Sequence, residues 1–241
     1  MKPASRFIQI FILLFSFLAS VAAEDETPAP FAAGETITYD ITKIGFKVGE
    51  AVLTYAGPRH VQGRDVILVT LVSKGPAFFD REAIYLDPAT FLPLRVERAV
   101  RFPGKKETIV EYYDQARGRA RIVKTARGTI TERVIEKGRP IENIYGFIYR
   151  YRSSGEFHVG EKRGVHLPTR DVTFTLAGKE KFNAAGTVYE AYAMESMPAQ
   201  YRVWFDVGAA KIPLRIDGAA GLGKTAMTLR LYTVSNVLTS P

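Results

Sequence analysis

The sequence predicts a mainly β protein in which antiparallel strands surround one α-helix. Two observations lead to this fold class. Short apolar stretches that alternate with polar residues recur along the chain, and turns rich in glycine separate them. Residues 141–152 alone depart from this alternation and place their apolar side chains at the spacing of a helix. The chain therefore reads as a series of hairpins interrupted once.

The first predicted hairpin covers the stretch from Phe31 to Tyr55. Apolar and polar residues alternate over 37–42, which is typical of a strand with one buried face. Gly45 and Gly49 interrupt the pattern, and residues 48–55 form a second apolar strand. We expect the rest of the chain to build on this hairpin.

Further strands are predicted wherever short apolar runs lie between turn residues. The run at 66–72 is continuous and β-branched, as expected of a strand covered on both faces. Strands between 94 and 136 carry many charged residues, which predicts one solvated side. The remaining predicted strands are 94–102, 108–113, 119–125, 129–136, 172–176, 187–194, 201–207, 212–216 and 226–234.

A weak internal repeat supports this β-rich organisation. Residues 83–87 lead to a second run at 92–97, and residues 202–206 lead similarly to 212–217. Each half reads as a strand, a turn containing Asp, and a strand opened by Pro-Leu-Arg. The repeat indicates a duplicated hairpin and carries no chemistry of its own.

The predicted helix covers residues 141–152, with Pro140 in its first turn and Ser153-Ser154-Gly155 at its end. At 100° per residue, Arg152 projects near the centre of the apolar stripe. An inward arginine at a helix C-terminus can bind the last carbonyls, pair with a buried carboxylate, or face a ligand. These three roles stay open, and Arg152 is the candidate ligand-binding residue of the sequence.

Composition removes several classes of chemistry. The 241 residues include no cysteine, which excludes disulfides, thiol nucleophiles, Cys-ligated zinc and a lipid-bearing N-terminal Cys. The three histidines are His60, His158 and His166, and the last two lie eight residues apart with no cluster of Asp, Glu or His at ligand spacing. We therefore expect no metal site and no cofactor.

The N-terminus predicts export. Residues 1–23 combine Lys2 and Arg6 with an apolar core of about twelve residues, shorter than the ~20 that span a bilayer, and end in small residues. We interpret 1–23 as a cleaved signal peptide, 24–30 as a flexible linker and 31–238 as one β-rich domain. The expected location is the periplasm or the exterior, with no transmembrane span after cleavage.

The net charge is +8, and it becomes +6 without residues 1–23. In an exported protein this charge favours contact with anionic envelope surfaces over nucleic acid, and a solvated basic face without a partner remains the alternative.

The segment from Gly218 to Thr225 matches the phosphate-binding pattern GxxxxGK[ST]. A P-loop requires a helix after the motif, whereas the residues after Thr225 alternate like a strand. We interpret Gly218–Thr225 as a glycine-rich turn and expect no nucleotide site.

No catalytic set stands out in the sequence. Carboxylates occur in pairs, but nothing in the sequence makes two of them converge across a cleft, and we expect them to be solvent-facing residues of strands and turns. These pairs are Asp80 with Glu82, Glu111 with Asp114, and Glu132 with Glu136. The chain has 12 Tyr and 15 Phe. Such aromatic residues usually fill a β core, whereas a groove lined by some of them would suit acyl chains or sugars.

Several short motifs, in order, are similar to those of a bacterial family known as domain of unknown function (DUF) 3108. The opening motif is Phe31-x-x-Gly34-Glu35-x-x-x-Tyr39-x-Ile41, followed by Gly45 and Val48-Gly49-Glu50-Ala51. The middle motif is Tyr149-Arg150-Tyr151-Arg152, followed by Val159-Gly160-Glu161, and the arginine of the family motif falls on Arg152. The closing motifs are Ala185-Gly186-Thr187-Val188-Tyr189-Glu190-Ala191, Val203-Trp204-Phe205-Asp206 and Pro213-Leu214-Arg215.

The resemblance covers residues 31–236 and implies an exported protein built as a spiral β-roll or an open half-barrel around one helix. Tyr145 departs from the small polar residue that the family often has there. The resemblance implies no activity. Periplasmic lipoprotein carriers are similar in architecture, but fold does not determine function.

We therefore favour a non-catalytic envelope protein that binds a hydrophobic or amphipathic ligand, or a partner protein, in a concavity of its sheet. The expected partners are a lipid, a glycan or an envelope protein. The alternatives are a structural interaction module without a small ligand and an enzyme that acts on envelope glycans or lipids.

Overall fold

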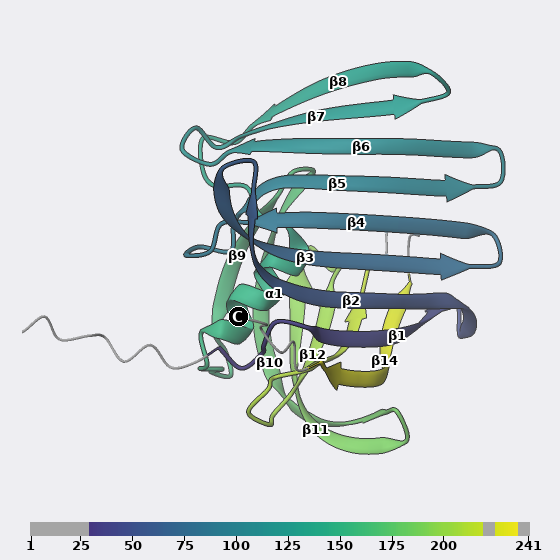
Figure 1. The fold of residues 1–241 in the computed structure, drawn as a ribbon. Helices are drawn as coiled ribbons and strands as arrows, with labels where there is room; N and C mark the ends of the chain where they lie inside the picture. The colour runs from purple at the N-terminus through teal and green to yellow at the C-terminus, as the bar shows by residue number, and fades with distance from the viewer. Residues whose placement is uncertain (1–28, 219–224, 236–241) are drawn as a thin grey trace, which may run out of the picture.

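The computed structural model describes residues 29–218 and 225–235. Within these ranges the chain forms fourteen strands and one α-helix, and all the strands belong to one antiparallel sheet that is not closed into a barrel (Figure 1). This confirms the predicted fold class. The predicted signal peptide at 1–23 and most of the predicted linker at 24–30 lie outside the described residues. The assignment of 31–238 to one domain stays a prediction.

The first eight strands form a meander in which each strand pairs with the next along the chain. Exposed residues dominate the last of these strands, which agrees with the solvated side that the sequence predicted. The strands are β1 (Glu35–Lys43), β2 (Phe46–Val61), β3 (Arg64–Gly75), β4 (Phe78–Leu86), β5 (Pro93–Phe102), β6 (Lys105–Asp114), β7 (Arg119–Ala126) and β8 (Thr129–Glu136).

The helix α1 (Ile144–Ser153) follows β8 and leads to a second meander. Its last strand, β14, pairs with β1, so the first and last strands of the chain lie side by side and β8 and β9 form the edges of the sheet. The strands of this meander are β9 (Lys162–Leu167), β10 (Arg170–Ala184), β11 (Thr187–Met197), β12 (Arg202–Asp206), β13 (Pro213–Asp217) and β14 (Ala226–Val234).

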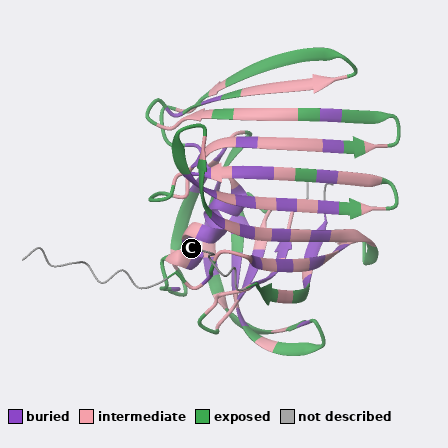
Figure 2. Ribbon diagram, in the orientation of Figure 1, coloured by how far each residue is buried: buried purple, intermediate pink, exposed green. Residues whose placement is uncertain are grey.

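The core lies on the inner face of the curled sheet, and α1 packs against that face (Figure 2). Along β1, Ile37, Tyr39 and Ile41 are fully buried, whereas the residues between them are partly exposed. The period of two in the sequence therefore corresponds directly to the inner and outer faces. No helix of the described residues has the length and apolarity needed to cross a membrane.

The helix begins later than the sequence predicted. Asn143 is its N-cap, and the Asn143 side chain accepts hydrogen bonds from the backbone N–H groups of Tyr145 and Gly146. Such a side-chain acceptor satisfies N–H groups that have no partner in the first turn. Pro140 therefore lies before the helix, and its assignment to the first helical turn was wrong.

The two hairpins of the internal repeat have the predicted form. Pro93 and Pro213 are the first residues of β5 and β13. The Asp87 carboxylate accepts hydrogen bonds from the backbone N–H groups of Ala89 and Thr90, which closes the turn after β4. Strand β9 was not predicted from the sequence, because Lys162–Leu167 has little alternation.

Candidate functional site

Arg152 lies in a fully enclosed ion pair with Glu35 on β1. Its guanidinium donates two parallel hydrogen bonds of 2.7 Å to the two carboxylate oxygens, and Nη2 also donates to the backbone oxygen of Ala210 at 2.9 Å. Both charged side chains are completely buried. Of the three roles that the sequence left open for Arg152, the structure shows the pairing with a buried carboxylate.

Aromatic side chains complete this cluster. The Tyr149 and Tyr232 hydroxyls each donate to Glu35 at 3.2 Å, and the Arg152 guanidinium carbon lies 4.7 Å from the centre of the Phe31 ring. Burial raises the pKa of Tyr149 well above its ordinary value, so its hydroxyl stays a donor. The cluster joins the opening motif, the helix and β14, which indicates a structural role. A ligand contact at Arg152 stays a prediction.

A second polar cluster surrounds Arg98 on the inner face of β4, β5 and β6. Arg98 donates from Nε to Asp80 at 2.9 Å, and Tyr113 donates to Glu111. Asp80 is buried, so the prediction that it faces solvent was wrong. The reason is the register, which places Asp80 on the same face as the core residues Ile84 and Leu86.

Among the carboxyl groups of this cluster, Glu82 has the most strongly raised pKa. Burial raises its pKa to about 7, although Arg98 and a 3.1 Å hydrogen bond from Asn143 act in the opposite direction. Burial likewise raises the pKa of Glu111. These carboxyl groups surround the Arg98 guanidinium. Paired acid and base catalysis needs two carboxyl groups on opposite sides of an open cleft, and this cluster does not have that arrangement.

The turns after β1, β3, β5 and β7 lie at one end of the strands, on the right in Figure 1. We call this end the tip edge and define it as residues 43–47, 74–78, 101–106 and 126–129. The tip edge contains seven basic residues and no acidic one. They are Lys43, Lys47, Lys74, Arg101, Lys105, Lys106 and Arg127.

A hollow of about 700 Å³ opens at the tip edge. Its apolar wall includes the rings of Phe78 and Phe102, whose centres are 6.2 Å apart in a stacked arrangement. We call this space the tip hollow. Its lining residues are Lys43, Lys47, Val48, Pro76, Ala77, Phe78, Phe102 and Lys105.

Two glycines provide the space for the Phe78 ring. A Cβ atom at Gly49 would lie 2.8 Å from that ring and 2.4 Å from the backbone oxygen of Lys74, and one at Gly75 would lie 2.4 Å from the ring. Any side chain at either position would therefore displace Phe78 or the backbone. Gly49 belongs to the Val48-Gly49-Glu50-Ala51 motif, so that motif positions the wall of the tip hollow.

The three lysines of the tip hollow differ in their partners. Lys47 lies 2.7 Å from Asp40, and this hydrogen bond is the main reason that its pKa is raised. Lys105 lies 3.3 Å from Glu107, which Lys124 also contacts at 2.8 Å. Lys43 has no carboxylate within ion-pair distance in the described part of the chain. The hollow therefore combines an apolar wall with ammonium groups that are only partly neutralised.

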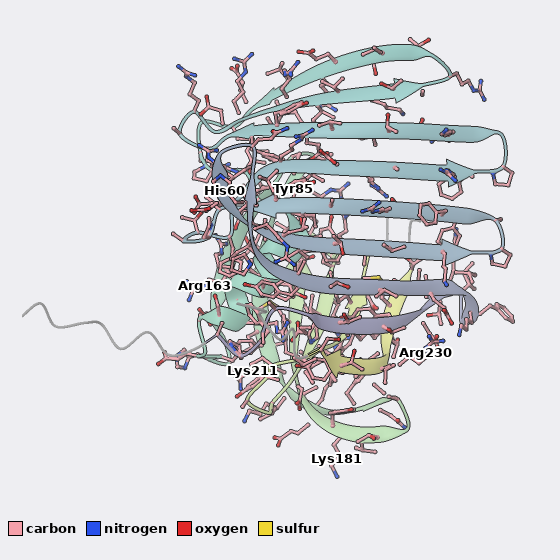
Figure 3. The ribbon with its side chains drawn as sticks, viewed as in Figure 1. His60, Tyr85, Arg163, Lys181, Lys211 and Arg230 are labelled. Carbon is pink, nitrogen blue, oxygen red and sulfur yellow. The ribbon has the colours of Figure 1, made fainter. Side chains whose placement is uncertain are left out.

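The neighbouring acidic groups are already paired. Glu50 forms an ion pair with Arg230 on β14, and Figure 3 shows Arg230 on the same side of the molecule as the tip edge. His60, at the other end of β2, lies far from the tip edge in the same view. The sheet thus separates a basic end from one of mixed charge.

The glycine-rich string Gly218–Thr225 joins β13 to β14, which pair in antiparallel fashion. The Gly218 N–H donates to the Thr225 backbone oxygen at 2.9 Å, and a strand, not a helix, follows Thr225. Residues 219–224 lie outside the described residues, so the turn stays a prediction.

The histidines do not gather in one place. His158 lies 3.1 Å from Glu156 in an exposed loop, and His166 on β9 lies 3.3 Å from Asp171. The described residues contain no group of three His, Asp or Glu side chains placed to hold a metal ion.

Sequence reasoning did not identify the tip hollow. Its residues come from three separate turns, and only strand pairing brings these turns together. One signal was available, because Gly75-Pro76-Ala77-Phe78 and Phe102-Pro103-Gly104-Lys105 both place an aromatic residue beside a turn. Turn residues are usually polar, so phenylalanines at these positions indicate a local apolar surface.

The solved structures that are similar to this chain share little of its sequence. A β-barrel-like protein of the DUF1849 domain of unknown function from Brucella abortus shares 8% identity over 84% of this chain and 98% of its own, with a TM-score of 0.48. A chain from Bacteroides fragilis named as a putative exported protein with a YmcC-like fold shares 9% identity over 85% and 97%, with a TM-score of 0.27.

No curated protein matches the sequence. The model of the family described as "Protein of unknown function (DUF3108)" matches residues 36–230, which include the helix that carries Arg152 and every residue that lines the tip hollow. The chain therefore belongs to the DUF3108 family.

Proposed function

We propose that this protein binds an amphipathic anion, meaning an acyl chain with a negatively charged head group, in the tip hollow. The observation that carries the proposal is the combination of an apolar wall built from Phe78 and Phe102 with three lysines around it. A volume of about 700 Å³ falls within the range of small-molecule sites.

The two parts of the hollow have different roles in this proposal. Burial of an acyl chain contributes roughly 0.8 kcal/mol per CH₂ group, so the apolar wall supplies most of the affinity. The lysines are exposed to water, where an ion pair contributes about 0–1 kcal/mol. They therefore select the sign of the head group, and Lys43 is best suited to do so because it has no ion-pair partner in the described ranges.

We further propose that residues 1–23 direct export and that the ligand is a lipid of the cell envelope. The basic, apolar segment at 1–23 supports export. Binding without catalysis is favoured because the carboxylates closest to an active-site arrangement surround Arg98, and Asp80 is already bound by it. An enzyme acting on envelope glycans or lipids and a purely structural module are the alternatives.

Calorimetric titration with two amphiphiles of the same chain length tests the proposal. We expect dodecanoate, below its micelle concentration, to bind one per chain, and dodecyltrimethylammonium to bind at least ten times more weakly. Equal affinity for the two amphiphiles, or no heat with either, would contradict the proposal.

Neighbouring phenylalanines provide a matched pair of variants. Phe78 lines the tip hollow, whereas Phe79 lies on the outer face of β4 against Arg101. We expect Phe78→Ala to weaken dodecanoate binding at least tenfold and Phe79→Ala to leave it within twofold of the parent protein.

A further inference from the structure

We propose that the tip edge docks on the surface of an anionic lipid bilayer, with Ile44 and Phe46 inserted among the lipids. This inference goes beyond the binding of a single amphiphile, because the proposed partner is a membrane surface. It rests on three observations at the tip edge: its charge, its exposed apolar side chains and its backbone.

Charge is distributed unequally between the two ends of the first meander. The tip edge has seven basic residues and no acidic one. The turns at the opposite end, residues 61–64, 86–93 and 114–119, contain three arginines and two aspartates. The net charges of these two sets of turns are therefore +7 and +1, so within the first meander an anionic surface would attract the tip edge more strongly than the opposite end.

Most of these basic groups are free to face a surface. Among residues 29–218 and 225–235, no carboxylate lies within ion-pair distance of five of the seven, which are Lys43, Lys74, Arg101, Lys106 and Arg127. In addition, Arg101 and Lys106 are direct cross-strand partners. Like charges placed opposite each other are unfavourable in an isolated sheet, and nearby anions would relieve that repulsion.

Two large apolar side chains extend from the same edge into water. Ile44 is 86% exposed and Phe46 is 74% exposed, and both lie in or next to the turn between β1 and β2. Packing within the chain does not explain why either of these exposed residues is apolar. Apolar groups flanked by lysines are the arrangement by which peripheral proteins insert into the interfacial region of a bilayer.

The backbone of this turn gives independent support. Ile44 has a φ of +51°, and Gly45 after it has a φ of +79°. A β-branched residue in the left-handed region is strained, and turns of this kind favour Asn or Gly at this position. Neither turn geometry nor packing explains an isoleucine here, whereas insertion into lipid does.

Vesicle co-sedimentation tests the inference. We expect the protein without residues 1–23 to bind vesicles of phosphatidylcholine with 30% phosphatidylglycerol and not vesicles of phosphatidylcholine alone. Binding should decrease steeply between 50 and 500 mM salt. Each of Lys43→Gln and Lys106→Gln should lower the partition coefficient about fivefold.

The apolar contribution needs its own variants. We expect the double variant Ile44→Ser/Phe46→Ser to lower the partition coefficient at least tenfold, and Val188→Ser, which removes an exposed apolar side chain on β11, to leave it unchanged. Far-UV circular dichroism and the melting temperature verify that each variant is folded. Equal binding to the two kinds of vesicle, or parent-like binding of the double variant, would overturn the inference.

The same variants separate this inference from the proposed function. Ile44 and Phe46 do not line the tip hollow, so the double variant should bind monomeric dodecanoate like the parent protein. Conversely, Phe78→Ala should lose dodecanoate binding and keep its affinity for anionic vesicles. If vesicle binding fails while dodecanoate binding persists, only the docking inference is wrong.

Discussion

At the scale of single residues, the Glu35–Arg152 pair is the feature most sensitive to change. The two side chains are fully buried and share two hydrogen bonds of 2.7 Å, and the tyrosines at 149 and 232 donate to the same carboxylate. A buried charge is stable only when its oppositely charged partner is present, because the protein interior does not solvate a charge as water does. The pair therefore links β1 to the end of α1.

Arg152→Met should lower the free energy of unfolding by about 3–5 kcal/mol, because it leaves Glu35 buried without a cation. Urea unfolding followed by Trp204 fluorescence measures this. The double variant Glu35→Gln/Arg152→Met should be more stable than Arg152→Met, since it removes the isolated charge. A loss below 1 kcal/mol in the single variant would show that the pair does not hold the fold together.

Glu82 should make stability depend on pH. Its pKa is about 7 in the folded protein against an ordinary value of 4.5. Between these pH values the folded state holds a proton that the unfolded state has lost, so the free energy of unfolding increases as the pH falls from 7 to 4.5. Above pH 7 the cost of ionising this carboxyl group in the folded protein is fully present.

The variant Glu82→Gln removes this penalty. At pH 8 it should be more stable than the parent protein by about 1–2 kcal/mol. A fully enclosed group with this pKa would give roughly 3 kcal/mol, and Glu82 is partly exposed. Near pH 4.5 the two proteins should unfold at the same urea concentration. A constant difference at pH 4.5 and pH 8 would contradict the assignment.

At the scale of elements, β2, β3 and β4 position the Phe78 ring in the wall of the tip hollow, because Gly49 on β2 and Gly75 on β3 leave room for it. Gly75→Ala should destabilise the protein by about 1–3 kcal/mol, because its Cβ would lie 2.3 Å from the Val48 oxygen. It should also weaken dodecanoate binding by moving Phe78. Gly164→Ala on β9 is the control, since its nearest neighbour would be the His166 ring at 3.9 Å. Equal unfolding curves for the two variants would refute this role of Gly75.

Most elements could be predicted because local pattern determines them. Ile37, Tyr39 and Ile41 face the core and alternate with partly exposed residues. The apolar stripe that contains Arg152 identifies α1. Local pattern failed where a tertiary contact decides the outcome. Asn143, rather than Pro140, begins the helix, and the partner of Arg152 lies 117 positions away in the sequence. The tip hollow was missed for the same reason, since strand pairing alone assembles it.

At the scale of the whole molecule, the pairing of β1 with β14 makes the two meanders parts of one sheet. We therefore expect one cooperative unfolding transition. Trp204 on β12 reports on the second meander alone, whereas far-UV circular dichroism reports on every strand. The two signals should give the same urea midpoint. Separate midpoints would show that the meanders unfold independently and that 31–238 is not one domain.

The central claim is that the tip hollow holds the acyl chain of an amphipathic anion. Photo-crosslinking with a fatty acid that carries a diazirine on its chain tests this most directly, because mass spectrometry of the peptides locates the adduct. We predict adducts within residues 76–78 and at Phe102, and their suppression by excess dodecanoate. Adducts concentrated beside Arg152, or spread over the surface and unaffected by dodecanoate, would contradict the account.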